Sequence, residues 1–421
     1  MSLAGATLIF ALTYLLIVSE RTHRTVAALL GAAAMVLFQI VDQETAFRAI
    51  DLNVILLLAG MMIIANVLRR TGVFQWTAVR AVRMSHADPF HLLVLLSLVT
   101  AVASAFLDNV TTVVLMVPVT LFIAARLDLD AAPFLIAEVL ASNIGGTATL
   151  IGDPPNILIG SAAGLNYLDF LSNALPAAAL ILLAFLITAR WLMVRGLAVD
   201  DERREEAMAL GEDDLITDRP LLAKGLGVLG LTLVGFMLHG QLDTGVATIA
   251  LAGASLLLLI SRLDVPDVLH EVEWSTLLFF VGLFVVVAGV VEAGLIEHIA
   301  DGMLAVTGGG LTATTLGLLW LSGLLSGIID NIPYTATMLP VVQQLGNEVE
   351  VRPLWWALAL GAGLGGNLTI VAASANILAA NLSARAGRVI SFGNFFRYGA
   401  VVTLEAMVIS SIYVWLRYLM W

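Results

Sequence analysis

Long apolar runs separated by short polar segments follow one another along the whole chain. Ten of these runs are long enough to cross a bilayer as a helix, which takes about 20 mostly apolar residues. Two of the ten, 133–160 and 354–382, contain glycine and small polar residues near the middle and are predicted to be broken helices. The other eight are predicted at 3–19, 25–41, 52–68, 168–195, 223–240, 245–261, 274–291 and 396–418. This pattern predicts an all-α polytopic membrane protein.

Two further apolar stretches, 90–125 and 312–345, are each interrupted near the middle by an Asp-Asn pair. Each stretch is too long for one span and has no polar loop to separate two full spans. A helical hairpin that enters and leaves on the same face of the membrane fits better, with its tip at the Asp-Asn pair. Irregular backbone at membrane depth is tolerated when it is buried in protein or lines a water-filled cavity. Both stretches are therefore predicted to be re-entrant hairpins.

The same motifs occur twice, about 222 residues apart. Phe106-Leu107-Asp108-Asn109-Val110 in the first half corresponds to Ile328-Ile329-Asp330-Asn331-Ile332 in the second, and the same offset relates Gly60 to Gly282. Each half, 1–199 and 223–421, then has five crossings and one hairpin. Because an odd number of crossings turns the second half upside down, the pattern predicts the inverted repeat of secondary transporters. In that architecture the binding site lies at the midplane, where broken helices from both halves meet.

The basic residues support this layout. If the N-terminus is outside, all of the 20 Lys and Arg except Arg48, Arg352 and Arg417 fall on the inner side. That distribution follows the positive-inside rule, and it depends on the hairpins being re-entrant. The segment 200–222, which holds many of the acids, is then predicted to be a solvated cytoplasmic linker of a multi-pass protein of the cell membrane.

The composition narrows the class of protein. It is 60% hydrophobic and 12% charged, with a mean hydropathy of +0.98 and a net charge of −12. Soluble domains have about twice that charged fraction. The chain has no cysteine, which excludes disulfides, thiolate metal sites and thiol chemistry. We expect a transporter in the lipid bilayer rather than an enzyme, with no cofactor beyond a coupling ion, H⁺ or Na⁺, and no nucleic-acid partner.

The tips of the two hairpins form the first candidate site. They carry Asp108, Asn109 and Thr111 in one half, and Asp330 and Asn331 in the other. Insertion of a carboxylate into the membrane within an apolar segment costs roughly 2.5–3.5 kcal/mol. Its presence at the same place in both halves therefore indicates a functional role. Carboxylate, amide and hydroxyl oxygens suit a hard cation, and a carboxylate can also carry a proton. The alternative is that each Asp caps the following helix, and a cap can still face a cavity.

The interruptions of the two broken helices form the second candidate site. Paired glycines allow unusual backbone angles, and Pro154-Pro155 disfavours helix at the residue before it. We expect unwound segments that offer carbonyls and helix ends to ions and polar solutes. The alternative is a structural kink that lets helices pack closely. The candidate residues are Ser142, Asn143, Gly145, Gly146, Thr147, Asp153 and Asn156 in the first half, and Gly365, Gly366, Asn367, Thr369, Ser374 and Asn376 in the second.

The two halves are not equivalent, because Asp153 is matched by Ala373. Three acids, Asp108, Asp153 and Asp330, are therefore expected at the midplane, with no Arg or Lys in these motifs to neutralise them. Like charges repel, so the site should attract protons, cations or a neutral polar solute coupled to them. A sodium ion would be held by Asp108, Asn109, Asn143, Asp330 and Asn331.

These motifs together resemble the ion transporter superfamily, most closely its arsenite permease and melanosomal P-protein branch. The motifs that carry the resemblance are Phe106 to Thr112, Ser142 to Ala148, and Gly152-Asp153-Pro154-Pro155-Asn156. The resemblance covers nearly the whole chain. It implies a homodimer whose protomers each have a scaffold and a mobile transport domain. That domain would carry both hairpins and both broken helices and would move like an elevator.

The resemblance leaves three functions open. The first is proton-coupled export of a small inorganic solute such as arsenite, antimonite or silicic acid, and the second is sodium/proton antiport. The third is cation-coupled uptake of a dicarboxylate, a tricarboxylate or another anion. The related divalent-anion/sodium symporters carry Ser-Asn-Thr at the hairpin tips, where this chain has Asp108-Asn109-Val110 and Asp330-Asn331-Ile332. That difference counts against sodium-coupled dicarboxylate uptake.

Replacement of either hairpin-tip acid tests the assignment of the first site. Asp108→Asn or Asp330→Asn keeps the shape of the side chain but removes its charge, so we expect coupled transport to be lost while the protein still folds. Flux in proteoliposomes measures the coupling, and size-exclusion chromatography measures the folding. Wild-type transport rates in both variants would contradict the assignment.

Overall fold

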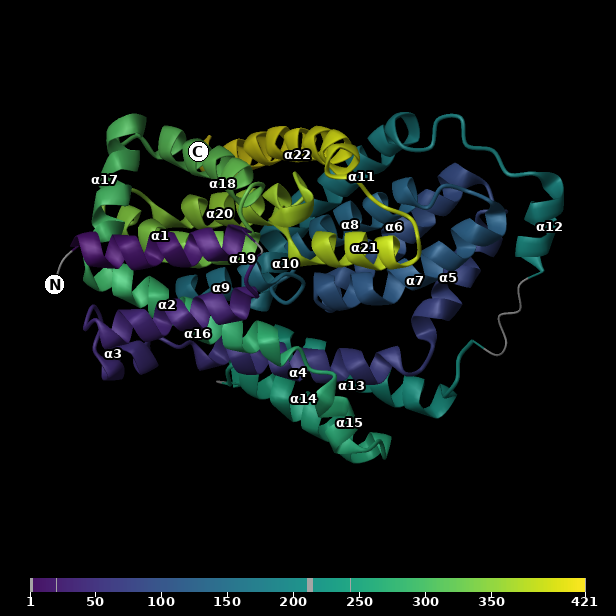
Figure 1. Cartoon of the computed structure of the whole chain (residues 1–421), viewed down its shortest axis with the longest axis horizontal. Coiled ribbons are helices and arrows are strands. Elements are labelled where there is room, and N and C mark those ends of the chain that lie inside the picture. Colours follow the sequence, from purple (N-terminus) through teal and green to yellow (C-terminus); the bar gives the residue numbers. More distant parts are fainter. Residues whose placement is uncertain (1–2, 20, 210–214, 243, 421) are drawn as a thin grey trace.

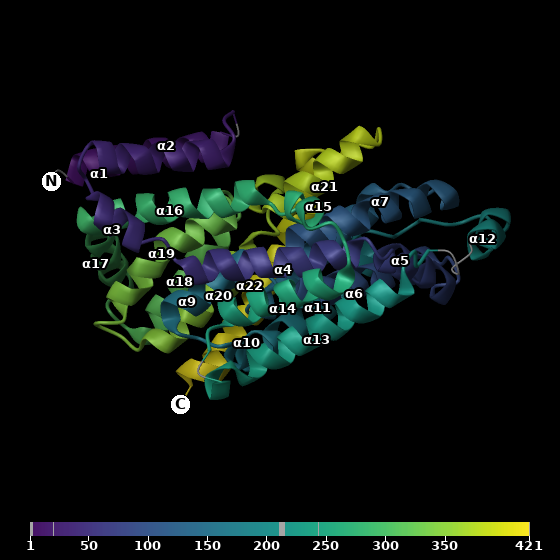
Figure 2. The ribbon, with the colours of Figure 1, turned by 90° about the horizontal axis from the view of Figure 1, so that it is seen from below.

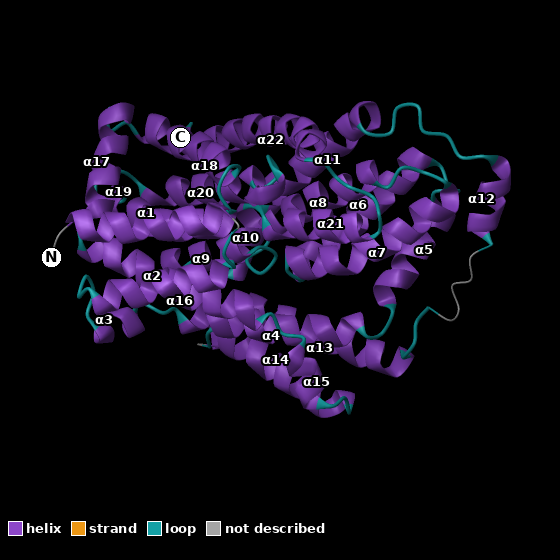
Figure 3. Cartoon of the chain, viewed as in Figure 1, coloured by secondary structure: helices purple, strands orange, loops and turns teal. Residues whose placement is uncertain are grey.

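A computed structural model describes residues 3–19, 21–209, 215–242 and 244–420, and every regular element in these ranges is a helix (Figure 3). The first half contains α1 (Leu3–Ser19), α2 (Arg24–Leu37), α3 (Gln43–Arg48), α4 (Leu52–Arg69), α5 (Val73–Met84), α6 (Pro89–Phe106), α7 (Asn109–Leu127), α8 (Ala132–Thr147), α9 (Pro154–Ala163), α10 (Tyr167–Asn173) and α11 (Leu175–Leu192). The short helix α12 (Asp201–Met208) follows.

The second half repeats this succession. It contains α13 (Arg219–Leu242), α14 (Val246–Ser261), α15 (Val265–His270), α16 (Trp274–Glu292), α17 (Leu295–Thr307), α18 (Leu311–Ser326), α19 (Asn331–Leu345), α20 (Val351–Gly365), the 3-10 turn Ile370–Ala372, α21 (Ser374–Arg385) and α22 (Phe392–Val414), which ends in the π-helical turn Trp415–Leu419. Each helix from α15 to α19 begins 222 residues after its counterpart among α3 to α7, as Gln43 and Val265 illustrate.

The helices form two groups along the long axis of the molecule. In one group α2 packs on α16 and α4 packs on α14, with α1 and α13 on their outer sides. In the other α6 packs on α8 and α18 packs on α20, with α11 and α22 at the edge. The hairpins and broken helices lie between the α13–α14 edge and the α11–α22 edge (Figure 1), and α1 and α2 stand out from the body in the view from below (Figure 2).

Both predicted hairpins have the shape of antiparallel helix pairs. Leu92 and Leu96 of α6 border one small gap together with Thr120 of α7, which places the start of one limb beside the far end of the other. In the second hairpin the hydroxyl oxygens of Ser322 and Tyr334 lie 3.0 Å apart across the turn. The re-entrant position of these hairpins in the membrane stays a prediction.

Several predicted spans differ from the helices in length. Seven helical segments of the described chain have the length and apolarity to cross a membrane, or eight if the bent pair α17–α18 is one span. Helices α1, α2 and α14 have only 17, 14 and 16 residues. Helix α2 ends at Leu37, four residues before the predicted end, because Gln39 has a left-handed backbone with φ 56°. At 1.5 Å per residue it is about 21 Å long, less than the hydrocarbon core.

Two other predicted segments contain more structure than the sequence indicated. The predicted span 168–195 is divided into α10 and α11, and the segment 200–222, whose role as a linker stays a prediction, contains α12 and the first turn of α13. Arg203 of α12 forms an ion pair with Asp128, just after α7, at 3.2 Å. The short helices α3, α5, α15 and α17 were not predicted, because they are too short or too amphipathic to appear as long apolar runs in the sequence.

The two halves touch most closely where glycines let backbones cross. A Cβ atom on Gly60 of α4 would lie 2.8 Å from the backbone of Ala250 in α14, and one on Gly282 of α16 would lie 2.6 Å from that of Ala28 in α2. The offset of 222 converts Gly60 into Gly282 and Ala28 into Ala250. The two crossings are therefore the same contact made twice, once by each half on the other. Small residues permit such close approach in membrane helices.

Substitution of these glycines tests the crossings. Gly60→Val or Gly282→Val should lower stability by about 1–3 kcal/mol or more, because the added side chain would overlap backbone atoms that cannot rotate away. Thermal unfolding followed by size-exclusion chromatography measures the loss. The matched control is Gly230→Val in α13, where nothing lies within 4 Å of the added Cβ. Equal stability of the three variants would contradict the crossing geometry.

Candidate functional site

Both broken helices are interrupted next to their paired glycines, as predicted, and the first helix resumes at Pro154. A buried asparagine bonds to the backbone at each interruption. Helix α8 ends at Thr147 and α9 begins at Pro154. The Asn156 side-chain amide donates to the carbonyls of Gly146, Thr147 and Thr149 at 3.2, 3.1 and 2.8 Å. The equivalent Asn376 donates to the carbonyls of Gly366 and Thr369 at 2.7 and 2.8 Å. Carbonyls freed by the break are thus bonded inside the protein.

Each hairpin is also bonded to the broken helix of its own half. Ser104 of α6 donates to the carbonyl of Ser142 at 2.8 Å, and Thr149 donates to the carbonyl of Ala105 at 2.5 Å. The second half repeats both bonds, from Ser326 to Ala362 at 2.6 Å and from Thr369 to Gly327 at 2.8 Å. A hairpin and its broken helix therefore form one bonded unit in each half.

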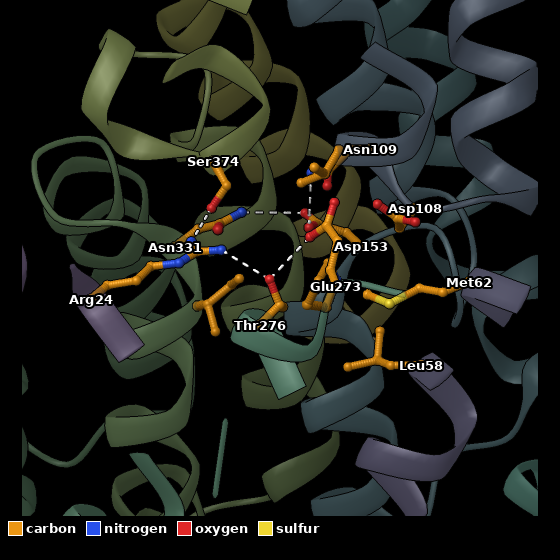
Figure 4. Close-up of a pocket in the computed structure, with 13 residues that line it drawn as sticks. Arg24, Leu58, Met62, Asp108, Asn109, Asp153, Glu273, Thr276, Asn331 and Ser374 are labelled. Carbon is orange, nitrogen blue, oxygen red and sulfur yellow. Dashed lines mark hydrogen bonds between the residues drawn. The ribbon is translucent and has the colours of Figure 1, made fainter. Parts of the chain in front are cut away.

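The two hairpin tips meet at Asp153, which lies just before α9 and is 1% exposed (Figure 4). The Asn109 side-chain amide donates to Oδ1 of Asp153 at 3.1 Å, and that of Asn331 donates to Oδ2 at 3.3 Å. No salt bridge to Asp153 occurs within the described part of the chain. One carboxylate is thus held by an amide from each half, with no positive charge paired to it.

A second polar contact joins the two broken helices. The Asn143 side-chain amide donates to the side-chain oxygens of Asn367 and Asn376 at 2.9 and 3.0 Å. Its own oxygen accepts from the Asn109 amide at 3.3 Å, so Asn143 lies directly behind the first hairpin tip. All these asparagines are buried. Asn143 therefore links the broken helix of the second half to Asn109 at the first hairpin tip.

Both hairpin-tip acids cap the helix that follows them, as the alternative interpretation proposed. Oδ1 of Asp108 accepts from the backbone N–H of Thr111 at 2.8 Å, and the Thr111 hydroxyl donates to Oδ2 at 2.5 Å. Oδ1 of Asp330 accepts from the backbone N–H of Ile332 at 3.0 Å. Capping does not remove these acids from the site, because each also borders a cavity.

The polar residues surround a small inner cavity of about 10 Å³, which is roughly the room one water molecule needs. A larger cavity of about 540 Å³, here called the vestibule, adjoins it. Residues that border both are Arg24, Val110, Glu273, Thr276 and Ser374. The inner cavity is also bordered by Asp108, Asn109, Asp153 and Asn331, and by the apolar Leu58, Met62, Pro154 and Ile332.

Arg24 changes the expected charge of the site. Its Nη1 lies 3.2 Å from Oδ2 of Asp330 and also contacts the hydroxyl of Ser374, while Nη2 donates to the Thr276 hydroxyl at 3.3 Å. The prediction of three acids without compensating charge was therefore wrong for Asp330. It failed because Arg24 is 306 residues away in sequence, and only the packing of α2 on α16 brings it to the second hairpin.

Glu273 is a fourth acid that the sequence interpretation missed. It precedes α16, accepts from the Thr276 hydroxyl at 3.0 Å and borders both cavities. Its position could have been found from the repeat, because an offset of 222 relates it to Asp51, and both acids stand directly before a predicted span. Four carboxyl groups and one guanidinium border the two cavities, so acidic groups outnumber basic ones there.

The remaining predicted residues form the frame of the site. Gly145 lies against the backbone of Ala101, and Gly365 lies against that of Gly323. Thr147 donates to the carbonyl of Asn143 at 2.8 Å. None of these residues borders the inner cavity.

The proposed sodium ligands lie in two places rather than around one point. Asp330 borders the vestibule, whereas Asp108, Asn109 and Asn331 border the inner cavity. Across the ranges that the structure describes, no three His, Asp and Glu side chains are placed to hold a metal ion together. A sodium ion would therefore depend mainly on amide, hydroxyl and water oxygens, and the sodium site stays a prediction.

Comparison with known proteins gives the family. The sequence pattern of the citrate transporter family, CitMHS, matches residues 14–361. The chain belongs to this family. An uncharacterised transporter of Mycobacterium bovis is 46% identical over 426 residues, which cover 99% of each chain. The human P protein is 35% identical over 496 residues, which cover 97% of this chain and 59% of the P protein, and this match confirms the resemblance to the P-protein branch.

A solved structure shares the fold. The YdaH transporter of Alcanivorax borkumensis aligns over 98% of both chains with a TM-score of 0.61, at 16% sequence identity. Together with the apolar helices, the family membership makes this chain a multi-pass membrane transporter that acts on a small solute or ion.

The asparagines that hold the broken helices can be tested by removing their amides. Asn376→Leu keeps the approximate size of the side chain but removes the shortest bonds to the buried carbonyls of Gly366 and Thr369 and the acceptor for the Asn143 amide, so we expect a loss of roughly 1–3 kcal/mol in stability. The matched control is Asn381→Leu on the same helix, where the side chain is exposed. Thermal unfolding in detergent measures both. A variant Asn376→Leu as stable as the control would show that the break needs no amide.

Proposed function

We propose that this protein is a secondary active transporter that couples proton movement to the export of a small neutral inorganic hydroxide, such as arsenite, antimonite or silicic acid. The observation that carries the proposal is Asp153, a buried carboxylate held by Asn109 and Asn331 without a paired positive charge. A buried charge of this kind is costly unless it binds a proton or a cation. Proton binding and release at Asp153 would therefore change the stability of the closed site.

The charge of the inner cavity supports a small neutral cargo, because the bordering acids outnumber the single guanidinium. At about 10 Å³ the cavity has room for roughly one hydroxyl group of such a solute, so the rest of the solute would lie in the vestibule. An anion would be repelled by Asp108, Asp153 and Glu273, whereas a neutral hydroxide can donate to carboxylates and accept from the amides of Asn109 and Asn331. The vestibule of about 540 Å³ would then be the route by which the solute approaches.

We further propose that the two halves form an inverted repeat. The matched crossings of Gly60 on Ala250 and Gly282 on Ala28 support a two-fold relation between the halves. The bonded units of hairpin and broken helix would move as a transport domain against the group formed by α2, α4, α14 and α16. This elevator motion, and a homodimer that anchors it, follow from the resemblance to the ion transporter superfamily.

The orientation that we propose places the N-terminus outside and the linker 200–222 in the cytoplasm of a cell with this protein in its plasma membrane. The excess of Lys and Arg on one side supports it. Arg24 no longer contributes to that excess, because its side chain pairs with Asp330 rather than lying at the membrane surface.

A second candidate function is cation-coupled symport of a carboxylate. The observation in its favour is Arg24, whose guanidinium borders both cavities and could contact a carboxylate of the cargo. The family description as citrate transporters also favours it. A citrate ion would have to open the inner cavity and bring cations to offset the acids.

Proteoliposomes that contain the purified protein test the proposal. We expect a pH gradient to drive arsenite flux that is unaffected by replacing sodium with choline. Asp153→Asn should lose the pH-driven flux by about 100-fold or more, because the amide can neither bind nor release the proton. The matched control is Asp301→Asn, an exposed acid of α17.

The same assay separates the alternatives. A sodium-driven pH change without any metalloid would replace the proposal by sodium/proton antiport. Citrate uptake in the absence of both activities would replace it by carboxylate symport. Full pH-driven arsenite flux in Asp153→Asn would show that another group carries the proton.

A further inference from the structure

Arg24 stands at the boundary between the vestibule and the inner cavity, and it is bound to three separate elements. Its guanidinium contacts Asp330 at the second hairpin tip, Ser374 at the start of α21 and Thr276 in α16. It also lies 5.2 Å from the centre of the Phe279 ring. The Arg24 side chain is 25% exposed and that of Asp330 is 10% exposed, so the pair is largely withdrawn from water.

The repeat shows that this arginine belongs to one half only. The offset that relates Asp108 to Asp330 relates Arg24 to Val246, a residue with no charge. No ion pair to Asp108 occurs among the described residues, and its carboxylate makes only the capping contacts with its own helix. Two equivalent acids therefore have different partners, a fixed guanidinium at Asp330 and none at Asp108.

The atoms around the guanidinium resemble those that would bind a free cation. A carboxylate oxygen of Asp330 and the hydroxyl oxygens of Ser374 and Thr276 converge on it. Carboxylate and hydroxyl oxygens are the ligands that hard cations prefer. The guanidinium supplies one positive charge at this place, and because it is covalently attached it cannot be transported.

We propose that Arg24 is a tethered cation that takes the place of a free monovalent cation at Asp330. The inference rests on the proposed function, in which the acids of the inner cavity bind the coupling ion. Of the two hairpin-tip acids, only Asp108 then serves a mobile ion, together with Asp153. The acid of the second hairpin is paired with a permanent charge on α2, and the transporter couples to one cation fewer than its repeat would allow.

The surrounding charges would retain a free cation if the guanidinium were removed. Glu273 faces the same space from α16, Asp153 faces it across Asn331, and His23 borders the vestibule just before α2. Without Arg24, no arginine would border the two cavities, and the charges of Glu273, Asp153 and Asp330 would not be offset by a guanidinium. A cation from solution should then bind at Asp330 and stabilise the folded protein by mass action.

Thermal unfolding of the full chain in sodium chloride and in choline chloride, at one fixed pH, tests the proposal. Arg24→Gln should be less stable than the wild type in choline, and sodium should raise its Tm by at least about 2 °C more than it raises that of the wild type. Arg24→Lys keeps the charge and should show no added sodium response. The matched control is Arg21→Gln, an exposed arginine in the loop just before α2, which should behave as the wild type.

The double variant Arg24→Gln with Asp330→Asn removes both charges and should lose the added sodium response. A response that persists in the double variant, or no response in Arg24→Gln, would overturn the proposal. If Arg24→Gln folds only in sodium, the proposal is supported. If it folds in neither salt while the double variant folds, sodium does not replace the guanidinium and the proposal falls. If neither variant folds, the guanidinium is needed for packing and the proposal also falls.

The readout requires no cargo, so it separates this inference from the proposed function. Sodium-responsive Arg24→Gln with no arsenite flux in the wild type would remove the proposed cargo and leave the tethered cation in place. Proton-coupled flux that depends on Asp153, with no sodium response in Arg24→Gln, would support the proposed function and overturn the tethered cation.

Discussion

The cost of a charge buried away from water is the constraint on which the centre of this structure depends. Asp153 is almost fully buried and has two amide donors, one from each hairpin tip, and no basic side chain of the described residues forms an ion pair with it. Amide donors offset only part of the hydration that the carboxylate loses. The site is therefore most stable when a proton or cation joins it, and least stable when it is empty. A coupled transporter needs such a difference between its loaded and empty states.

The frame around this charge is built to be rigid. Asn156 and Asn376 bond the carbonyls that the helix breaks release, and hydroxyls such as Ser104 and Ser326 fasten each hairpin to its broken helix. These bonds occur at the same places in both halves. Bonds of this kind between a hairpin and its broken helix favour their movement as one body, with the carboxylate as the group whose bonding changes.

The two halves share this frame but differ in charge. The first contributes Asp153, where the second has Ala373, and it contributes Arg24, where the second has Val246. Packing then places the arginine of the first half against Asp330 of the second. An acid paired with an arginine and an equivalent acid with only capping contacts among the described residues result from one duplicated motif, and the difference lies in residues outside that motif.

The sequence by itself determined the membrane class, the pairs of hairpins and helix breaks and the acids at their tips, because apolar length, glycine, proline and an internal offset are local properties of the chain. Tertiary structure alone decided which charges meet. Arg24 reaches Asp330 across 306 residues, and Glu273 reaches the cavity although it stands just before the start of a predicted span. The physical reason is that a motif specifies the backbone around it, whereas the electrostatic partner of a buried charge depends on how distant helices pack.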